Sequence, residues 1–337
     1  MNYIGSKYSL LDFIDSVVSE ITANHSKKII FCDAFAGTGA VGRYFRDKGH
    51  KIISNDIQHY SYVINRHLIN NKTLKFDKID ILNNLPEKEG FIFKNYCYGS
   101  GSGRMYFSDQ NGKKCDAIRQ EIEKLYKLHR IDEDEYYGYL AMLIEAIDKV
   151  ANTASVYGAY LKQLKKSALK TMNIAELQAS NEIRGEVYNE DINTLINSIQ
   201  GDILYLDPPY NTRQYSSNYH LLETISRYDR PEISGKTGLR NTEKQKSKYS
   251  SIRTVESEFE YLIKQARFSY ILLSYNNEGL MSSDAVKNIM SKYGSYSLKI
   301  KEYRRFKADK TENRNHKANS TKEYLHILKK ERANASI

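Results

Sequence analysis

The residues best suited to do chemistry are Asp207-Pro208-Pro209-Tyr210, which directly follow the apolar run Ile203 to Leu206. Proline fixes φ and has no N–H, so the two prolines hold a stiff, extended turn and leave the Pro208 carbonyl free to accept a hydrogen bond. Asp207 adds a carboxylate acceptor, and Tyr210 adds a flat ring. Two acceptors beside a stacking surface suit the exocyclic amine of a planar base.

A second stretch of this kind is Gly37 to Gly42, which matches G-x-G-x-x-G, and Asp56 stands where the next predicted strand ends. Such glycines let a backbone approach a nucleotide closely, and the acid suits ribose hydroxyls. The pattern leaves NAD and other adenosine-containing cofactors open. Asp33, just before the loop, would repel a pyrophosphate and attract a cation. It therefore favours S-adenosylmethionine, which carries an ammonium and a sulfonium group, unless Asp33 only caps the loop.

These two stretches together predict methyl transfer to an amine. The amine of adenine is a weak nucleophile, because its lone pair is delocalised into the ring. If Asp207 and Pro208 accept both N–H bonds, the nitrogen moves towards tetrahedral geometry and its lone pair can attack a sulfonium methyl group in line. Positioning and electrostatic help of this kind can lower a barrier by several kcal/mol. A base within a duplex cannot reach such a corner, so we expect it to be flipped out and stacked on Tyr210.

The elements that must position these residues alternate along the chain. Apolar spacing predicts helices over 10–21, 41–46, 59–70 and 192–199, and strands over 28–31, 51–54, 186–191, 202–206 and 270–274. Two alternating runs, 297–306 and 322–329, predict an antiparallel pair at the sheet edge. Alternating strands and helices predict an α/β fold, a Rossmann-like and mostly parallel sheet with an antiparallel edge strand.

A helical insertion interrupts this pattern. Residues 98–112 are rich in Gly and Ser and predict a loop, whereas 116–128 and 135–178 have helical spacing. We therefore expect a catalytic domain of residues 1–90 and 183–337 and an insertion of 91–182. The insertion, together with the loop 211–253, is the candidate region for recognising a target.

Composition points to a polyanionic partner. The chain has 337 residues, a net charge of +10 and 28 tyrosines, a combination that suits phosphate contact and base stacking, although many tyrosines must simply pack in the core. No His or Cys cluster has metal-ligand spacing, so we expect no metal and three reduced thiols. Acidic residues within the first apolar stretch argue against a signal peptide, and no apolar run is long enough to cross a membrane. We expect a cytoplasmic protein.

The chain resembles the DNA adenine methyltransferases of the DPPY class, which include Dam-type and restriction–modification enzymes. The resemblance covers most of 1–80 and 186–330, and the motif order is similar to the α arrangement of these enzymes. It implies that S-adenosylmethionine is the cofactor and that Asp207, Pro208, Pro209 and Tyr210 are catalytic. By the same resemblance, the residues that line the cofactor site are Tyr3, Gly5, Lys7, Asp33, Phe35, Gly37, Gly39, Asp56, Asp191, Ile192 and Asp207.

Double-stranded DNA is then the expected partner, and the resemblance to restriction–modification enzymes implies a cognate restriction endonuclease as a functional partner. Arg213, Gln214 and Asn218 are candidates for contacts with bases or phosphates, unless Gln214 and Asn218 only satisfy loop backbone groups. In the insertion, Arg104 and the basic run 160–170 are further candidates for phosphate contacts. Within that run, Lys162, Lys165 and Lys166 have spacing that lets them share a helix face, with a solvated surface as the alternative.

Four other functions remain open at this point. Enzymes that methylate N4 of cytosine more often have Ser in place of Asp207, and RNA adenine or protein amide methyltransferases more often have NPPY. An NAD-dependent oxidoreductase would leave Asp207 to Tyr210 without a role. A DNA-binding module without activity would not need an intact cofactor loop.

Overall fold

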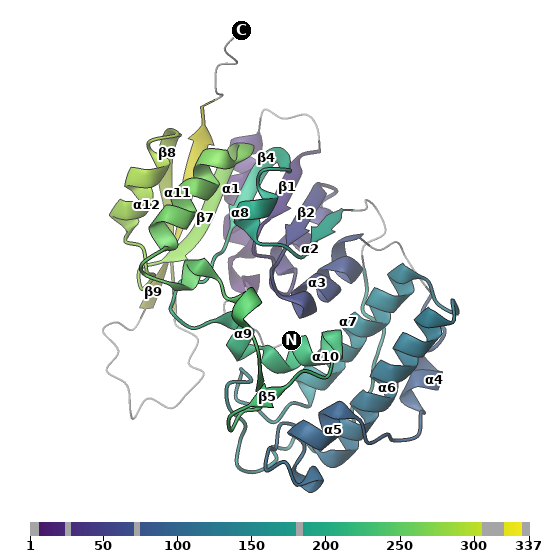
Figure 1. Cartoon of the computed structure of the whole chain (residues 1–337). Helices are drawn as coiled ribbons and strands as arrows, with labels where there is room; N and C mark the ends of the chain where they lie inside the picture. The colour runs from purple at the N-terminus through teal and green to yellow at the C-terminus, as the bar shows by residue number, and fades with distance from the viewer. Residues whose placement is uncertain (1–6, 24–27, 71–74, 180–184, 305–319, 332–337) are drawn as a thin grey trace.

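The computed structural model describes residues 7–23, 28–70, 75–179, 185–304 and 320–331. Its centre is a seven-stranded sheet in the order β3-β2-β1-β4-β7-β9-β8 (Figure 1). The strands are β1 (Ile30–Asp33), β2 (Lys51–Asn55), β3 (Glu186–Tyr188), β4 (Gln200–Leu206), β7 (Arg267–Asn276), β8 (Gly294–Arg304) and β9 (Ser320–Lys330). A separate hairpin pairs β5 (Ile233–Ser234) with β6 (Leu239–Arg240).

Parallel pairing brings the predicted site residues to one edge of the sheet. β1 pairs in parallel with β2 and with β4, in registers that include Asp33↔Ser54 and Asp33↔Tyr205. Because the carboxyl ends of parallel strands share an edge, the ends of these three strands lie next to one another. The cofactor loop and Asp207 therefore start from neighbouring strands, as the sequence predicts.

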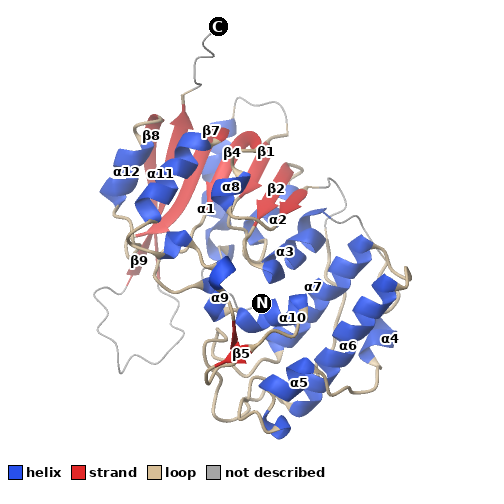
Figure 2. Ribbon diagram, viewed as in Figure 1, coloured by secondary structure: helices blue, strands red, loops and turns tan. Residues whose placement is uncertain are grey.

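Helices cover the sheet and build a second body beside it (Figure 2). The α-helices are α1 (Leu11–Thr22), α2 (Ala40–Asp47), α3 (His59–Asn65), α4 (Ile79–Asn83), α5 (Phe91–Tyr96), α6 (Asp109–Lys127), α7 (Glu133–Lys149), α8 (Ile192–Leu195), α9 (Tyr215–Asn218), α10 (His220–Arg227), α11 (Val255–Gln265) and α12 (Ser283–Met290). Short turns are η1 (Tyr8–Leu10), the π-helical η2 (Arg66–Asn70), η3 (Tyr98–Ser100), η4 (Glu243–Gln245) and η5 (Lys248–Ser250).

The antiparallel pair predicted from the last two alternating runs is confirmed. β8 and β9 pair along eleven residues, and β9 also pairs antiparallel with β7. β8 is the edge strand, and β9, which runs antiparallel to both of its neighbours, lies between β8 and β7. Glu323, Leu325 and Ile327 on one face of β9 are buried, and so are His326 and Leu328 on the other, as expected of a strand inside the sheet.

The helical insertion is confirmed only in part. α6 begins at Ser108, whose side chain accepts from the Asn111 N–H, and α7 begins with a capping box between Asp132 and Glu135. α7 ends at Lys149, however, and the predicted helix over 135–178 is wrong beyond that point.

Residues 150–179 form no helix, because backbone groups in and near this segment form hydrogen bonds with side chains instead of with one another. The Asn152 amide donates to the carbonyls of Met105 and Leu161, and its Oδ1 accepts from the Lys165 N–H. These side-chain bonds compete with the i→i−4 bonds of a helix. Consequently Lys162, Lys165 and Lys166 do not share a helix face.

The insertion and the sheet share one continuous hydrophobic core. One apolar cluster contains Phe31 and Tyr205 from the sheet and Tyr96, Ile118 and Leu143 from the insertion. α10 follows β4 in the chain, yet it packs against both α3 and α7 (Figure 1). In the described ranges, no helix has the length and apolar character needed to cross a membrane.

Candidate active site

The Asp207 corner lies at the end of β4. β4 ends at Leu206, so Asp207 lies just past the sheet edge, while Pro208 is buried and Tyr210 is half-buried. The Tyr210 carbonyl accepts from the Leu280 N–H at 3.1 Å, which fixes the turn from its far end. Within the described ranges no group donates to the Pro208 carbonyl. The corner therefore offers a carboxylate and a free carbonyl.

Lys7 holds the Asp207 carboxylate from behind. Its Nζ lies 2.8 Å from Asp207 Oδ1 and 3.8 Å from Glu323 Oε1, and Lys7 is only 7% exposed. Burial alone would lower the pKa of Lys7, but the two carboxylates outweigh it and the pKa is raised. Burial raises the pKa of Asp207, and Lys7 opposes that shift. Lys7 therefore stays charged, whereas the predicted cofactor residues Tyr3 and Gly5 lie outside the described residues.

Glu323 was not predicted from the sequence. It is 4% exposed, comes from β9, and accepts from the Ser274 hydroxyl at 2.6 Å. The sequence signal that could have identified it is its spacing. A carboxylate two residues before Leu325 lies on the same face of the strand as that apolar residue. Its contact with Lys7 connects residues near opposite ends of the chain, so no local sequence pattern predicts it.

The glycine loop has the strained backbone that its sequence suggests. Gly37 and Gly39 have φ of 51° and 75°, and a Cβ on Gly39 would lie 2.7 Å from Asn65 Oδ1. Any other residue at position 39 would therefore be strained and crowded. Ser61 and Asn65 from α3 both donate to the Gly37 carbonyl, which fixes the loop.

Two acids, the buried Asp33 and the half-buried Asp56, hold this loop from either side. Asp33 Oδ2 accepts from the Gly42 N–H at 3.0 Å, and Asp56 Oδ2 accepts from the Gly37 N–H at 2.8 Å. Burial raises the pKa of Asp33 to about 7 against the Gly42 hydrogen bond, and it raises the pKa of Asp56 to about 6. Asp33 therefore does cap the loop, while its acidic group also borders a cavity.

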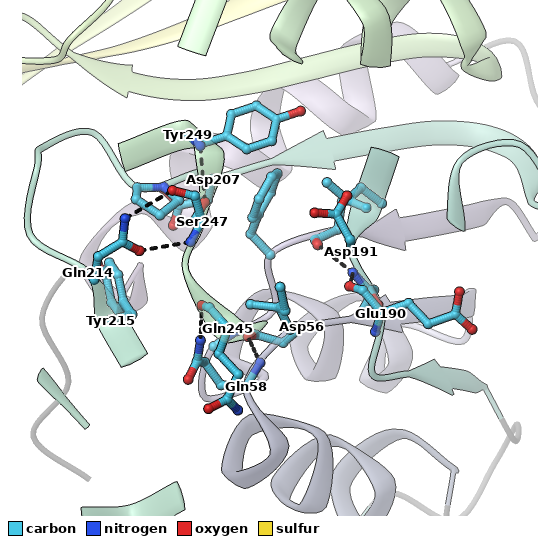
Figure 3. Close-up of a pocket in the computed structure, with 17 residues that line it drawn as sticks. Asp56, Gln58, Glu190, Asp191, Asp207, Gln214, Tyr215, Gln245, Ser247 and Tyr249 are labelled. Atoms are coloured by element: carbon cyan, nitrogen blue, oxygen red, sulfur yellow. Dashed lines mark hydrogen bonds between the residues drawn. The ribbon is translucent and has the colours of Figure 1, made fainter. Parts of the chain in front are cut away.

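Two adjoining cavities open at these residues. The larger, about 720 Å³ with its open mouth included, is lined by Ala34, Phe35, Gly37, Asn55, Asp56, Ile57, Gln58, Glu190, Asp191, Ile192, Asp207, Pro209, Gln214, Tyr215, Gln245, Ser247 and Tyr249 (Figure 3). The smaller, about 320 Å³, is lined by Lys7, Asp33, Phe35, Ala36, Gly37, Thr38, Ala40, Val41, Tyr205 and Asp207. Phe35, Gly37 and Asp207 belong to both, so the cavities meet beside the acidic corner.

The far wall of the larger cavity begins at Asp191 and Ile192. Asp191 is the N-cap of α8, with Oδ1 accepting from the Asn193 N–H at 2.8 Å, and Ile192 is buried. Asp56 lies at the end of the neighbouring strand, so acidic and apolar groups alternate along this wall (Figure 3). Such a wall suits a ribose and a purine ring.

A segment that sequence reasoning missed closes the opposite side. This wall segment, residues 245–249, comes from the polar loop after β6. The Gln214 amide donates to the Ser247 carbonyl at 3.1 Å and accepts from the Ser247 N–H at 2.8 Å (Figure 3). Gln58 donates to the Gln245 carbonyl at 3.1 Å, and the Tyr249 hydroxyl donates to Asn193 Oδ1 at 2.9 Å.

Gln58, which lines the larger cavity, also carries a buried acceptor. It is 3% exposed, and within the described residues its Oε1 has no hydrogen-bond partner. A buried acceptor without a donor is costly unless a ligand supplies one. Together with two adjoining cavities and a glycine loop of positive φ, it fits an adenosine-containing cofactor with a cationic end.

The predicted DNA contacts are distributed unevenly. Arg213 is exposed, and Asn218 is half-buried beside the insertion, with its backbone carbonyl accepting from the Tyr157 N–H. Gln214 is engaged by Ser247, so it satisfies loop backbone groups as the alternative reading expects. Arg104 donates to the carbonyls of Asn95, Gly235 and Lys236, and thereby ties the insertion to the β5–β6 hairpin.

The basic run of the insertion is exposed only in part. Lys162 and Lys166 are exposed, whereas the Lys165 ammonium donates to the Thr153 carbonyl at 2.7 Å. Lys165 therefore has a structural partner, and a role of Lys162 and Lys166 in binding DNA stays a prediction.

Comparison with known proteins decides the family. A family described as "D12 class N6 adenine-specific DNA methyltransferase" matches residues 3–275, which include the glycine loop and the Asp207 corner. The chain belongs to this family. The methyltransferase is thus an S-adenosylmethionine-dependent enzyme that acts on N6 of adenine in DNA. The alternatives of an NAD enzyme, an N4-cytosine enzyme, an RNA or protein methyltransferase and an inactive module are set aside.

Relatives cover the methyltransferase over nearly all its length. It is 55% identical over 334 residues to the type II methyltransferase M.NlaIII of Neisseria lactamica, covering 98% of this chain and 99% of that protein. It is 38% identical to M.CviAII of Paramecium bursaria Chlorella virus 1, with coverage of 91% and 93%. M.FokI of Planomicrobium okeanokoites is also 38% identical over 98% of this chain, which spans about half of that longer protein.

Proposed function

We propose that this methyltransferase is the modification enzyme of a restriction–modification system. It methylates N6 of adenine within a specific duplex DNA sequence after flipping the base out. The relatives named as type II methyltransferases support the biological role. The observation that carries the mechanism is the Asp207 carboxylate beside the free Pro208 carbonyl, at the meeting point of two cavities.

The cofactor would be held by residues of both cavities. When bound, S-adenosylmethionine supplies a methyl group made electrophilic by the sulfonium. In the larger cavity Asp56 and Gln58 would accept from ribose hydroxyls, and Ile192 would offer an apolar surface to the adenine ring. In the smaller cavity Asp33 attracts the ammonium of the amino-acid end.

The Asp207 corner acts on the target amine. Asp207 and the Pro208 carbonyl accept its two N–H bonds, which orients the lone pair and stabilises the positive charge that develops on nitrogen. Tyr210 supplies a ring beside the corner, and Pro209 and Tyr215 line the same cavity. A base must leave the duplex to reach these groups, which is why base flipping is part of the proposal.

The insertion and the loop after β4 form the target-recognition region in this proposal. Arg213 and Lys162 are exposed, so their charged groups are accessible for contacts with phosphates. Arg104 contributes indirectly, because it holds the β5–β6 hairpin against the insertion. The division into a catalytic domain and a recognition insertion remains a proposal, since a continuous core joins them.

Transfer of a tritiated methyl group to DNA by the purified protein tests this function. The wild type should label duplex DNA that contains its target sequence, and Asp207→Ala should label it at least about a hundredfold more slowly, the scale on which a lost electrostatic contact lowers kcat. Lys287→Gln, an exposed residue on α12, is the matched control and should label normally. Undiminished labelling by Asp207→Ala would remove Asp207 from the mechanism.

A further inference from the structure

Behind the catalytic corner lies a buried acid that the mechanism so far does not use. Glu323 is on β9, and its Oε1 lies 3.8 Å from Lys7 Nζ and 2.6 Å from the Ser274 hydroxyl, which donates to it. Lys7 in turn lies 2.8 Å from Asp207. The three charged groups therefore form a row that starts inside the sheet and ends at the reacting corner. Glu323 lies beyond residues 3–275, the part of the chain that matches the family.

The charges in this row do not cancel. Lys7 already has the Asp207 carboxylate as a close partner, so a second buried carboxylate leaves an excess negative charge. Burying a charge is costly, and an acid that only packed in the strand could be replaced by an apolar residue at lower cost. The position would suit such a residue, since the neighbouring inward residue Leu325 is apolar and buried. The buried charge of Glu323 is therefore better explained by a function than by packing.

The surrounding titratable groups do not supply a competing cation. Burial raises the pKa of both Glu323 and Asp207, and in each case Lys7 opposes the shift. The groups that act on this row, taken from every element around it, are Lys7, Asp33 at the end of β1, Tyr205 of β4, Tyr210, and Glu278 after β7. Lys7 is the only base among these, and all the others are acids.

We propose that Glu323 is a positioning residue that draws part of the Lys7 charge away from Asp207, so that the Asp207 carboxylate keeps its full strength as an acceptor for the target amine. The inference rests on the role proposed above for Asp207. As the amine lone pair forms the N–C bond and the C–S bonding pair returns to sulfur, the nitrogen becomes positive and then releases one hydrogen as a proton to water. A carboxylate neutralised by Lys7 alone would stabilise that charge less.

Glu323→Gln tests the proposal, because it keeps the shape and the hydrogen bond to Ser274 but removes the charge. We expect kcat to fall about tenfold, the effect of roughly 1.4 kcal/mol, while the calorimetric Kd of S-adenosylmethionine changes less than about twofold. The acidic limb of the kcat–pH profile should move to lower pH by about half a unit or more, because Lys7 then acts on Asp207 undivided. Glu323→Asp should recover part of kcat.

Three outcomes would overturn the proposal: an unchanged kcat, an unmoved acidic limb, or a loss of kcat explained by a weaker cofactor Kd. If Glu323→Gln does not fold, Ser274→Ala provides the second test. It removes the hydroxyl whose hydrogen bond lowers the pKa of Glu323, so the charged form of Glu323 is disfavoured. We therefore expect a lower kcat at unchanged Kd, and an unchanged kcat contradicts the proposal. Asp207→Ala distinguishes a failure of the role proposed for Asp207 from a failure of the role proposed for Glu323. If that variant is inactive while Glu323→Gln is fully active, only the role of Glu323 falls.

Discussion

At the residue scale, the acids of the site differ in what they bind. Asp56 accepts from two backbone N–H groups, those of Gly37 and Gln58, and it lines the larger cavity. Gln58, two residues later, adds an acceptor that has no donor among the described residues. A ribose with two neighbouring hydroxyls would satisfy both side chains at once.

This arrangement predicts the effect of two substitutions on cofactor affinity. Asp56→Ala should raise the Kd of S-adenosylhomocysteine about ten- to a hundredfold, because it removes a charged acceptor, and Gln58→Leu should raise it about three- to tenfold. Isothermal titration calorimetry measures both, with Lys287→Gln as the unaffected control. Equal affinities for wild type and Asp56→Ala would remove the ribose from this position.

Asp33 predicts a dependence of stability on pH. Its pKa in the folded protein is about 7, raised by burial, whereas an unfolded Asp has a pKa of about 3.9. Its contribution to stability is therefore complete below about pH 4 and is lost as the pH rises through about 7. The unfolding temperature of the wild type, measured relative to Asp33→Asn, should fall across that window. A constant difference would show that Asp33 does not titrate there.

At the element scale, the wall segment 245–249 owes its position to side chains from other elements. Gln214 makes two bonds to the Ser247 backbone, while its neighbour Arg213 is exposed. The two adjacent residues thus serve different purposes: Gln214 shapes the cavity, and Arg213 faces solvent on the side proposed for DNA.

Their substitution should separate these purposes. Gln214→Ala should weaken cofactor binding several-fold and leave the salt dependence of DNA binding unchanged. Arg213→Ala should reduce the slope of log K against log salt by about 1 and leave cofactor affinity unchanged. Fluorescence anisotropy across a salt series measures the slope. The reverse pattern would make Gln214 the DNA contact.

The same scale shows what the sequence could predict. The strands, the glycine loop and the Asp207 corner follow from local patterns, because apolar periodicity and proline or glycine chemistry act within a few residues. The pairing of Lys7 with Glu323 and the place of residues 245–249 depend on contacts between distant parts of the chain. The helix predicted beyond Lys149 fails for a similar reason, since Asn152 bonds to the carbonyl of Met105.

At the scale of the whole molecule, the side proposed for DNA is the one that carries the insertion. The net charge is +10, and the insertion with the β5–β6 hairpin lies beside the carboxyl edge of the sheet, opposite α12 (Figure 1). Exposed Lys162 and Lys166 belong to that side. A duplex held there would present a flipped base to the cavity.

Charge removal tests this assignment. The double variant Lys162→Gln/Lys166→Gln should weaken DNA binding and lower the salt slope by about 1 to 2, because each lost phosphate contact releases about one counterion fewer. Lys287→Gln on α12 removes a charge from the far side and should leave the slope unchanged. Equal slopes in all three proteins would assign the two insertion lysines to a solvated surface.

The most direct measurement is a crystal structure of the protein with target DNA and S-adenosylhomocysteine. The account predicts that the target adenine lies outside the duplex, with its N6 about 2.7–3.2 Å from both an Asp207 oxygen and the Pro208 carbonyl, and with the cofactor sulfur on the side of Asp207 where the two cavities meet. An adenine N6 held by other groups, or a sulfur far from that corner, would contradict it.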